Sequence, residues 1–343
     1  MLQEPSTQHS QQQSTNVIFK FELLLIQSSF ICLQLERLQD KAGKDLVISL
    51  GIVFKRMNGQ EIYDITEKNQ RMCIRCISLC IRKYSDVLIG DTLIDMATVL
   101  ELFAQPSTPA TSRFEALFCI RTKLFRSFPQ LNVSKEEEMD IDNKVASLCI
   151  ELMLSNDHSN VKSALWMVGS WVESVQFPEE DMERVCTAVV ELVHYWPDSK
   201  HAALATLYIL VGGGQFPDSL VDVILDLFGQ LSIGNSEEFG VILQMLDCLC
   251  ANNKLNTSQI NALVDDILVR SRSFLLIDSI GVDPTNHHNS FVTKTNLEDI
   301  SKFLKRLREV GRLSLDRYEE IDNFVAVVEL CAWQKSSSSD SDV

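Results

Sequence analysis

The sequence lacks an uninterrupted apolar run long enough to cross a membrane. A transmembrane helix needs about 20 consecutive apolar residues, and the stretch 17-VIFKFELLLIQSSFICLQL-35 is interrupted by Lys20, Glu22 and several polar residues. The preceding residues, 1-MLQEPSTQHSQQQSTN-16, also lack the positively charged region of a secretory signal peptide. These absences predict a protein without a membrane span, in the cytoplasm, the nucleus or both.

Positive charge is scarce in the last two thirds of the chain. Residues 129–343 contain 34 Asp and Glu against 16 Lys and Arg, whereas residues 1–128 contain 13 against 15. A negative surface repels phosphate backbones and attracts basic segments. We therefore predict protein partners with basic segments and disfavour nucleic acid, although charge does not exclude nucleic acid for residues 17–128.

The ten cysteines lack the spacing of a disulfide framework or a metal site. In 71-RMCIRCISLCIRK-83, Cys73, Cys76 and Cys80 share one face of a predicted helix. Thiols in a row along a helix do not converge on a metal ion, and free cysteine packs as a small hydrophobic residue. We predict that these three thiols belong to the core.

Catalytic and cofactor-binding motifs are also missing. The run Gly212-Gly213-Gly214 is not followed by the Lys-Ser/Thr of a phosphate-binding loop. His287, His288 and Asp283 have the wrong spacing for a preformed metal site. The sequence thus predicts a protein that is not an enzyme and that uses no cofactor; a helical enzyme with a metal ion in the 277–296 loop is a remote alternative.

The apolar residues that are present recur at spacings of three and four almost throughout, which is typical of amphipathic helices. Alternation with period two is scarce, and turn-forming residues separate the segments. We therefore predict an all-α fold. Its expected parts are a disordered polar tail 1–16, irregular helical repeats 17–128, an acidic linker 129–142, regular repeats 143–276, a long loop 277–296, a helical hairpin 297–334 and a disordered acidic, Ser-rich tail 335–343.

The middle of the chain repeats with a period of 39 residues. The segment 177-FPEEDMERVCTAVVEL-192 aligns with 216-FPDSLVDVILDLFGQL-231 and with 255-LNTSQINALVDDILVR-270, and the intervening helices align at the same offset. A helical hairpin cannot bury its apolar face alone, so stacked hairpins share a continuous core.

One helix carries the pattern of a known repeat class. The segment 157-DHSNVKSALWMVGSW-171 resembles HEAT and armadillo repeats through Asp157, Val161, Lys162, Ala164, Val168 and Gly169. The resemblance covers residues 143–272. It implies a right-handed α-solenoid of stacked antiparallel helical hairpins, and a scaffold or adaptor of the kind used in cargo carriage, coat assembly, phosphatase scaffolding or chromosome organisation.

The helical period also selects candidate binding residues. At 100° per residue, Trp171 and its apolar neighbours face inward while Trp166 points the opposite way. A 39-residue shift extends this outward set to the next two helices, and aromatic residues on such a surface anchor partners. The predicted partner-binding residues are Lys162, Trp166, Glu173, His201, Tyr208 and Gln244; the alternative is that Trp166 packs against a neighbouring helix.

Two further hypotheses concern the ends of the chain. The last residues, Ser341, Asp342 and Val343, resemble a PDZ-domain ligand, and a solubilising tail is the alternative. The runner-up function is a component of a chromosome or nucleic-acid complex that contacts DNA or RNA through residues 17–128, with Arg71, Arg75, Arg82 and Lys83 as the contacts. The chain as a piece of a longer solenoid is a further alternative.

Overall fold

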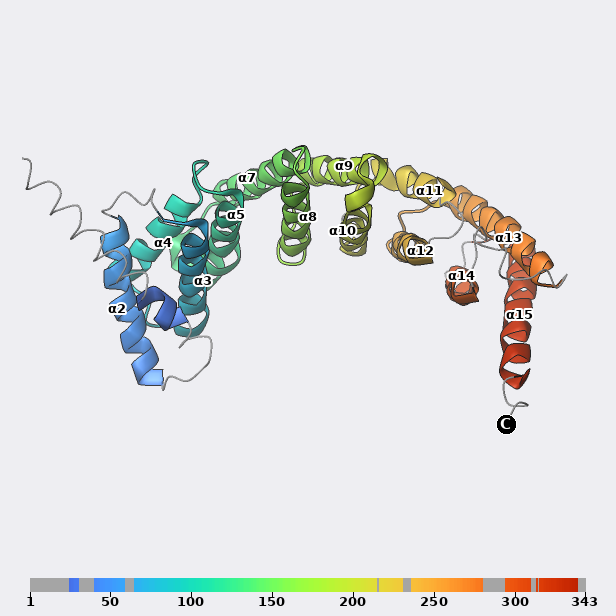
Figure 1. Ribbon diagram of the computed structural model, residues 1–343, viewed down its shortest axis with the longest axis horizontal. Coiled ribbons are helices and arrows are strands. Elements are labelled where there is room, and N and C mark those ends of the chain that lie inside the picture. The colour runs from blue at the N-terminus through green and yellow to red at the C-terminus, as the bar shows by residue number, and fades with distance from the viewer. Residues whose placement is uncertain are drawn as a thin grey trace, which may run out of the picture. The chain divides into compact units, whose positions relative to one another are not determined.

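The computed structural model describes residues 25–30, 40–58, 65–214, 216–230, 236–279, 294–309, 313 and 315–338 (Figure 1). Among these residues every regular element is a helix and strands are absent, which confirms the all-α prediction. The helices are α2 (Asp40–Asn58), α3 (Glu67–Tyr84), α4 (Asp91–Phe103), α5 (Ala110–Cys119), α6 (Phe125–Ser127), α7 (Lys135–Met153), α8 (His158–Val172), α9 (Glu179–Tyr195), α10 (Lys200–Gly212), α11 (Val221–Gln230), α12 (Ser236–Ala251), α13 (Thr257–Ser279), α14 (Lys294–Glu309) and α15 (Leu315–Ser338).

The chain forms two compact units, Met1–Leu148 and Cys149–Val343. In the first unit α2 packs on α4, and α3 packs on α5. Gly51 permits the close crossing of α2 and α4, because a Cβ atom there would lie 2.6 Å from the Thr92 methyl carbon. A single π-helical turn, η2 (Ile120–Leu124), joins α5 to α6.

The predicted acidic linker 129–142 differs from the structure, because α7 begins inside it at Lys135. The Ser134 hydroxyl accepts a hydrogen bond from the Glu137 backbone N–H at 3.2 Å, and the Glu137 carboxylate accepts one from the Ser134 N–H at 2.8 Å. This reciprocal pair is a capping box, which begins a helix, and negative charge in the first turn stabilises it. Residues 135–142 of the predicted linker are therefore helical.

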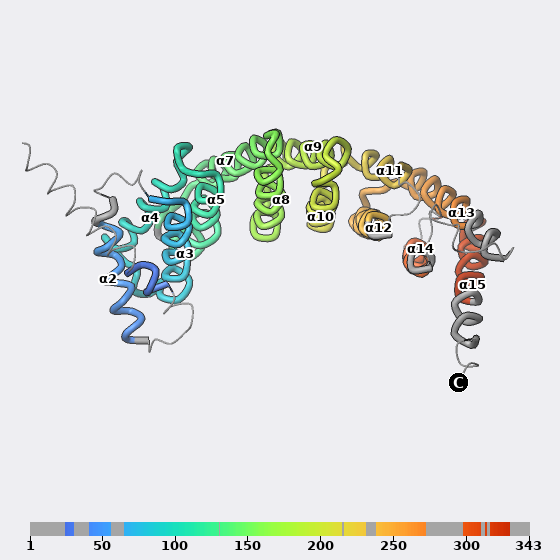
Figure 2. Tube along the Cα trace, in the orientation of Figure 1, coloured from blue at the N-terminus to red at the C-terminus, as the bar shows by residue number. Residues whose placement is uncertain are grey.

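The second unit contains two rows of helices. α8, α10, α12 and α14 contact one another in turn, and the hairpin partners α9 and α10, and α11 and α12, pack together. Figures 1 and 2 show α9, α11 and α13 following one another along one side of this unit, with α8, α10 and α12 on the other. Helices one repeat apart in the sequence are thus neighbours in space.

Burial in this unit follows the 39-residue alignment. At the positions aligned in all three first helices and all three second helices, the side chains are buried except those of Leu225 and Val172, which are half-buried. The triplet Val185, Ile224 and Leu263 is 0%, 0% and 4% exposed. The apolar positions of the repeat are therefore core positions.

Polar bonds connect successive hairpins. The Ser219 hydroxyl donates to the Glu183 carboxylate at 2.6 Å, and Lys254 Nζ donates to the Asp218 carboxylate at 2.6 Å. Each bond joins residues 36 positions apart, close to one repeat length. These exposed bonds link neighbouring hairpins, and the packing of the helices brings their partners together.

At its C-terminal end the described chain differs in part from the predicted loop and hairpin. α13 extends to Ser279 and α14 begins at Lys294, so only residues 280–293 of the region remain outside the described residues. α14 pairs antiparallel with α15 through Lys305–Glu329 and Arg308–Asp322, and it also contacts α12. The tail 1–16, the Asp283, His287 and His288 group, and Ser341, Asp342 and Val343 all lie outside the described residues.

Candidate functional site

The residues predicted to bind a partner lie on the exposed sides of α8, α10 and α12. Trp166 is 51% exposed and Tyr208 is 38% exposed, although the neighbouring Trp171 is fully buried. The helical period produces this contrast, since residues five apart lie on opposite faces. We define the aromatic face as Lys162, Trp166, Glu173, His201, Tyr208 and Gln244, all of which are exposed.

Local hydrogen bonds hold the helices that carry the aromatic face. The Asp157 carboxylate caps α8 by accepting from the Ser159 N–H at 2.8 Å. The His158 ring Nδ1 and the Ser199 hydroxyl are hydrogen-bonded at 3.2 Å, which connects the start of α8 with the start of α10. This hydrogen bond links the N-terminal ends of α8 and α10.

An ion pair connects α10 to α12. Lys200 Nζ lies 2.7 Å from a Glu238 carboxylate oxygen, and the Glu238 side chain is only 13% exposed. Further along α12, Asp247 lies 2.6 Å from Arg306 of α14. Burial raises the pKa of Asp247, and Arg306 partly opposes that shift.

Charge is distributed unevenly among the helices of the second unit. α8 and α10 each contain one lysine and one histidine and no acid, whereas α9 contains five acids and one arginine. α11 adds Asp222 and Asp226 without a base, and α12, which carries Gln244 of the aromatic face, contains Glu237, Glu238 and Asp247 without a base. An average over residues 129–343 hides this distribution, which a count of charges helix by helix shows.

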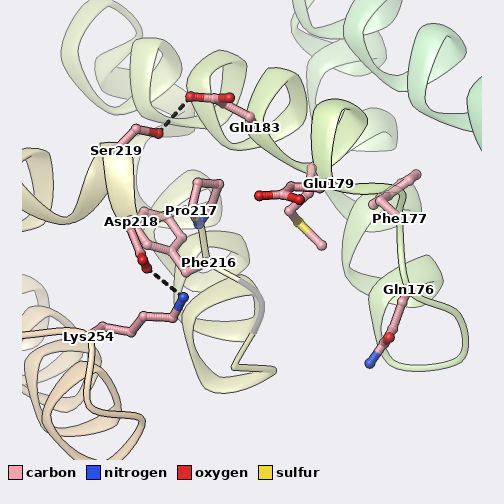
Figure 3. Close-up of a pocket in the computed structure, with 10 residues that line it drawn as sticks. Gln176, Phe177, Glu179, Glu183, Phe216, Pro217, Asp218, Ser219 and Lys254 are labelled. Carbon is pink, nitrogen blue, oxygen red and sulfur yellow. Dashed lines mark hydrogen bonds and ion pairs between the residues drawn. The ribbon is translucent and has the colours of Figure 1, made fainter.

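A cleft opens at the turns that precede α9 and α11 (Figure 3). It has a volume of about 570 Å³ and is lined by Phe177, Met182, Phe216 and Pro217, with Glu179 extending toward Pro217. The bonds Ser219–Glu183 and Lys254–Asp218 border it. Histidine and cysteine are absent from its lining, and Phe177 and Phe216 are equivalent positions of the repeat.

The cysteine thiols are core groups, as predicted. Cys73, Cys76 and Cys80 are free and fully buried. Burial raises the pKa of Cys73 to about 12. Within the described residues, groups of three or more side chains that could hold a metal ion are absent, and none of the helices is long and apolar enough to span a membrane.

Two of the arginines proposed to contact nucleic acid, Arg71 and Arg75, are engaged in ion pairs. Arg71 and Arg75 lie 2.7 Å and 2.8 Å from the same Glu115 carboxylate oxygen, and the Glu115 side chain is 11% exposed. Arg82 is exposed. The Glu115 charge partly neutralises the basic side of α3.

Comparisons with known proteins assign no family. The chain matches no protein family model and no curated protein. Among solved structures, an engineered protein from the Northeast Structural Genomics Consortium superposes with a TM-score of 0.30 at 13% identity, over 88% of this chain and 97% of that one. A TM-score of that size carries no conclusion about function.

Proposed function

We propose that this protein is a non-enzymatic scaffold or adaptor that binds a partner protein through the aromatic face of a HEAT/armadillo-like α-solenoid. The solenoid part of the proposal is supported by the contacts between equivalent helices one repeat apart, α8 with α10 and α10 with α12. Polar bonds between residues 36 to 38 positions apart support it further. Both features are expected when hairpins stack in one dimension.

The exposure of Trp166 is the observation that carries the binding proposal. A tryptophan that is 51% exposed leaves about 100 Å² of surface in water, and its burial under a partner would contribute about 2 kcal/mol. Tyr208, on the neighbouring helix, adds a second amphipathic ring. Tryptophan and tyrosine are enriched among the residues that dominate binding energy at interfaces.

Affinity purification from native lysate tests this function. The intact protein is compared with the Trp166→Ala/Tyr208→Ala variant, after circular dichroism and thermal unfolding show that both fold alike. We expect a partner that copurifies with the intact protein and is lost with the variant.

Tyr195→Ala is the matched control, because Tyr195 is 77% exposed, lies at the end of α9 and does not belong to the aromatic face. This control should retain the partner. Recovery of the same partners with both the intact protein and the double variant would contradict binding at the aromatic face. A fall in unfolding temperature of many degrees in Trp166→Ala would instead favour a packing role for Trp166.

A further inference from the structure

A second surface lies on α9, in a groove between this helix and the end of α7. The groove has a volume of about 450 Å³. Its apolar floor consists of Ile150, Leu154 and Ala188, and its rim carries Glu180, Glu183 and Glu191. None of these residues belongs to the aromatic face.

The floor of this groove presents apolar surface to solvent. Leu154, just after the last turn of α7, is 67% exposed. Ala188, a small residue at the middle of α9, also lines the groove and is 7% exposed. An exposed leucine beside a small residue is a place where an apolar side chain of another molecule gains burial.

The rim remains negatively charged in the folded protein. Arg184, the one base in the lining, pairs with Asp181 at 3.0 Å. Glu183 accepts a hydrogen bond from the neutral Ser219 hydroxyl, which leaves its charge uncompensated. The groove therefore combines an apolar floor with a rim of carboxylates.

Helix stability does not account for all of these acids. Negative charge is favourable in the first turn of a helix, where Glu180 lies. Glu191 lies beyond the first turn of α9, where the dipole no longer favours a carboxylate, and Glu180 and Glu183 are like charges on successive turns. This arrangement is complementary to positive charge.

We propose that the α7–α9 groove binds a basic amphipathic helix of a partner protein. Apolar side chains of that helix would cover Leu154 and Ala188, and lysines or arginines would meet the rim. Glu180 and Glu191 are eleven residues apart on α9, or about 16 Å along its axis, which corresponds to three turns of a partner helix. A channel between two helices is a common place for a third amphipathic helix to dock.

Fluorescence anisotropy with a synthetic peptide tests the proposal on the full-length protein. The probe is a fluorescein-labelled helical peptide of about 18 residues, or five turns, with leucine on one face and lysine on the other. Its matched control replaces every lysine with glutamate. We expect the lysine peptide to bind, with an affinity that falls as salt rises, and the glutamate peptide not to bind.

Two matched triple variants locate the binding. Glu180→Gln/Glu183→Gln/Glu191→Gln should weaken binding about tenfold, since three surface charge contacts are lost. Glu298→Gln/Glu309→Gln/Glu319→Gln removes the same charge from exposed positions on α14 and α15 and should leave the affinity within about twofold. Equal weakening by both triples would overturn the proposal in favour of non-specific attraction.

The apolar floor has its own test. Leu154→Asn changes an exposed residue without changing charge, so we expect an unchanged fold and an affinity about threefold lower. Full affinity in this variant, or no binding of the lysine peptide to the intact protein, would overturn the proposal. Trp166→Ala/Tyr208→Ala should bind the peptide normally, which keeps this surface distinct from the aromatic face.

Discussion

Among the individual residues, the cysteines show how burial determines chemistry. Of the eight cysteines whose side chains are described, seven are buried and Cys248 is half-buried. Desolvation raises the pKa of Cys119 and of Cys186 to about 12, as it does for Cys73. Because the thiolate is the nucleophile and the metal ligand, these side chains are inert at neutral pH.

We predict that iodoacetamide at pH 8 labels Cys73, Cys119 and Cys186 only slowly in the native protein. With a pKa of about 12, about one thiol in 10⁴ is ionised at that pH, and the labelling rate should rise roughly tenfold per pH unit while the fold persists. Peptide mass spectrometry measures the labels, and guanidinium-unfolded protein is the control. Rapid native labelling of Cys73 would show that the first unit opens.

Asp157 is a second residue whose role is local. Asp157→Ala should lower the free energy of unfolding by about 1 kcal/mol, because the first turn of α8 loses its side-chain acceptor. Urea unfolding measures the loss. Asp157→Asn keeps an acceptor at the same place and should remain within a few tenths of a kcal/mol of the intact protein; an equal loss in both variants would assign the effect to charge instead.

Among the elements, each helix of the repeat buries the apolar residues that its sequence pattern marks. The helices that cover those residues include equivalent helices one repeat away. α10 is a clear case, because it packs on its hairpin partner α9 and also on α8 and α12. Its buried residues include Ala203, Leu207 and Leu210, positions that the 39-residue alignment marks as apolar. The second helix of this central hairpin therefore packs against both the preceding and the following repeat.

The contact between α3 and α5 leads to a prediction about the basic side of α3. Glu115→Gln should destabilise the first unit by about 1 kcal/mol, because Arg71 and Arg75 lose a half-buried ionic partner while remaining partly in water. Urea unfolding measures this change, with the exposed Glu101→Gln on α4 as the matched control.

The same variant tests the nucleic-acid hypothesis. If Arg71 and Arg75 contact phosphates, their release from Glu115 should strengthen binding to duplex DNA severalfold at low salt, and Glu101→Gln should not. No DNA binding by either variant would count against that hypothesis.

At the scale of the whole molecule, the chain has two compact units, each with its own core. Phe114 in the first unit and Phe216 in the second are both 1% exposed, which makes them a matched pair of probes.

We predict that Phe114→Ala and Phe216→Ala each remove about 3–5 kcal/mol, and that each acts on a different unfolding transition. Guanidinium unfolding followed by circular dichroism, together with hydrogen exchange resolved along the sequence, distinguishes the two. A common shift of all transitions by either variant would mean that the two units unfold as one.

Local information in the sequence was sufficient for several features. Spacings of three and four predict helices because each amphipathic helix must bury one stripe, and the 39-residue repeat correctly placed buried positions such as Val185 and Ile224. The exposed state of Trp166 and Tyr208 also follows from helical period. Whether these two rings bind a partner stays a prediction.

The sequence by itself therefore determined the helices, the apolar positions of the repeat and the burial of the thiols, because these depend on spacing along one helix. Only the tertiary structure decided that Glu115 pairs with two arginines, that Glu183 meets Ser219, and that Leu154 and Ala188 share a groove beneath carboxylates. These contacts join residues up to 44 positions apart, and the packing of helices on one another selects them. The number of acids in each helix belongs to the sequence, whereas the tertiary structure decides which carboxylates meet a partner, as Glu183 meets Ser219 and Glu238 meets Lys200.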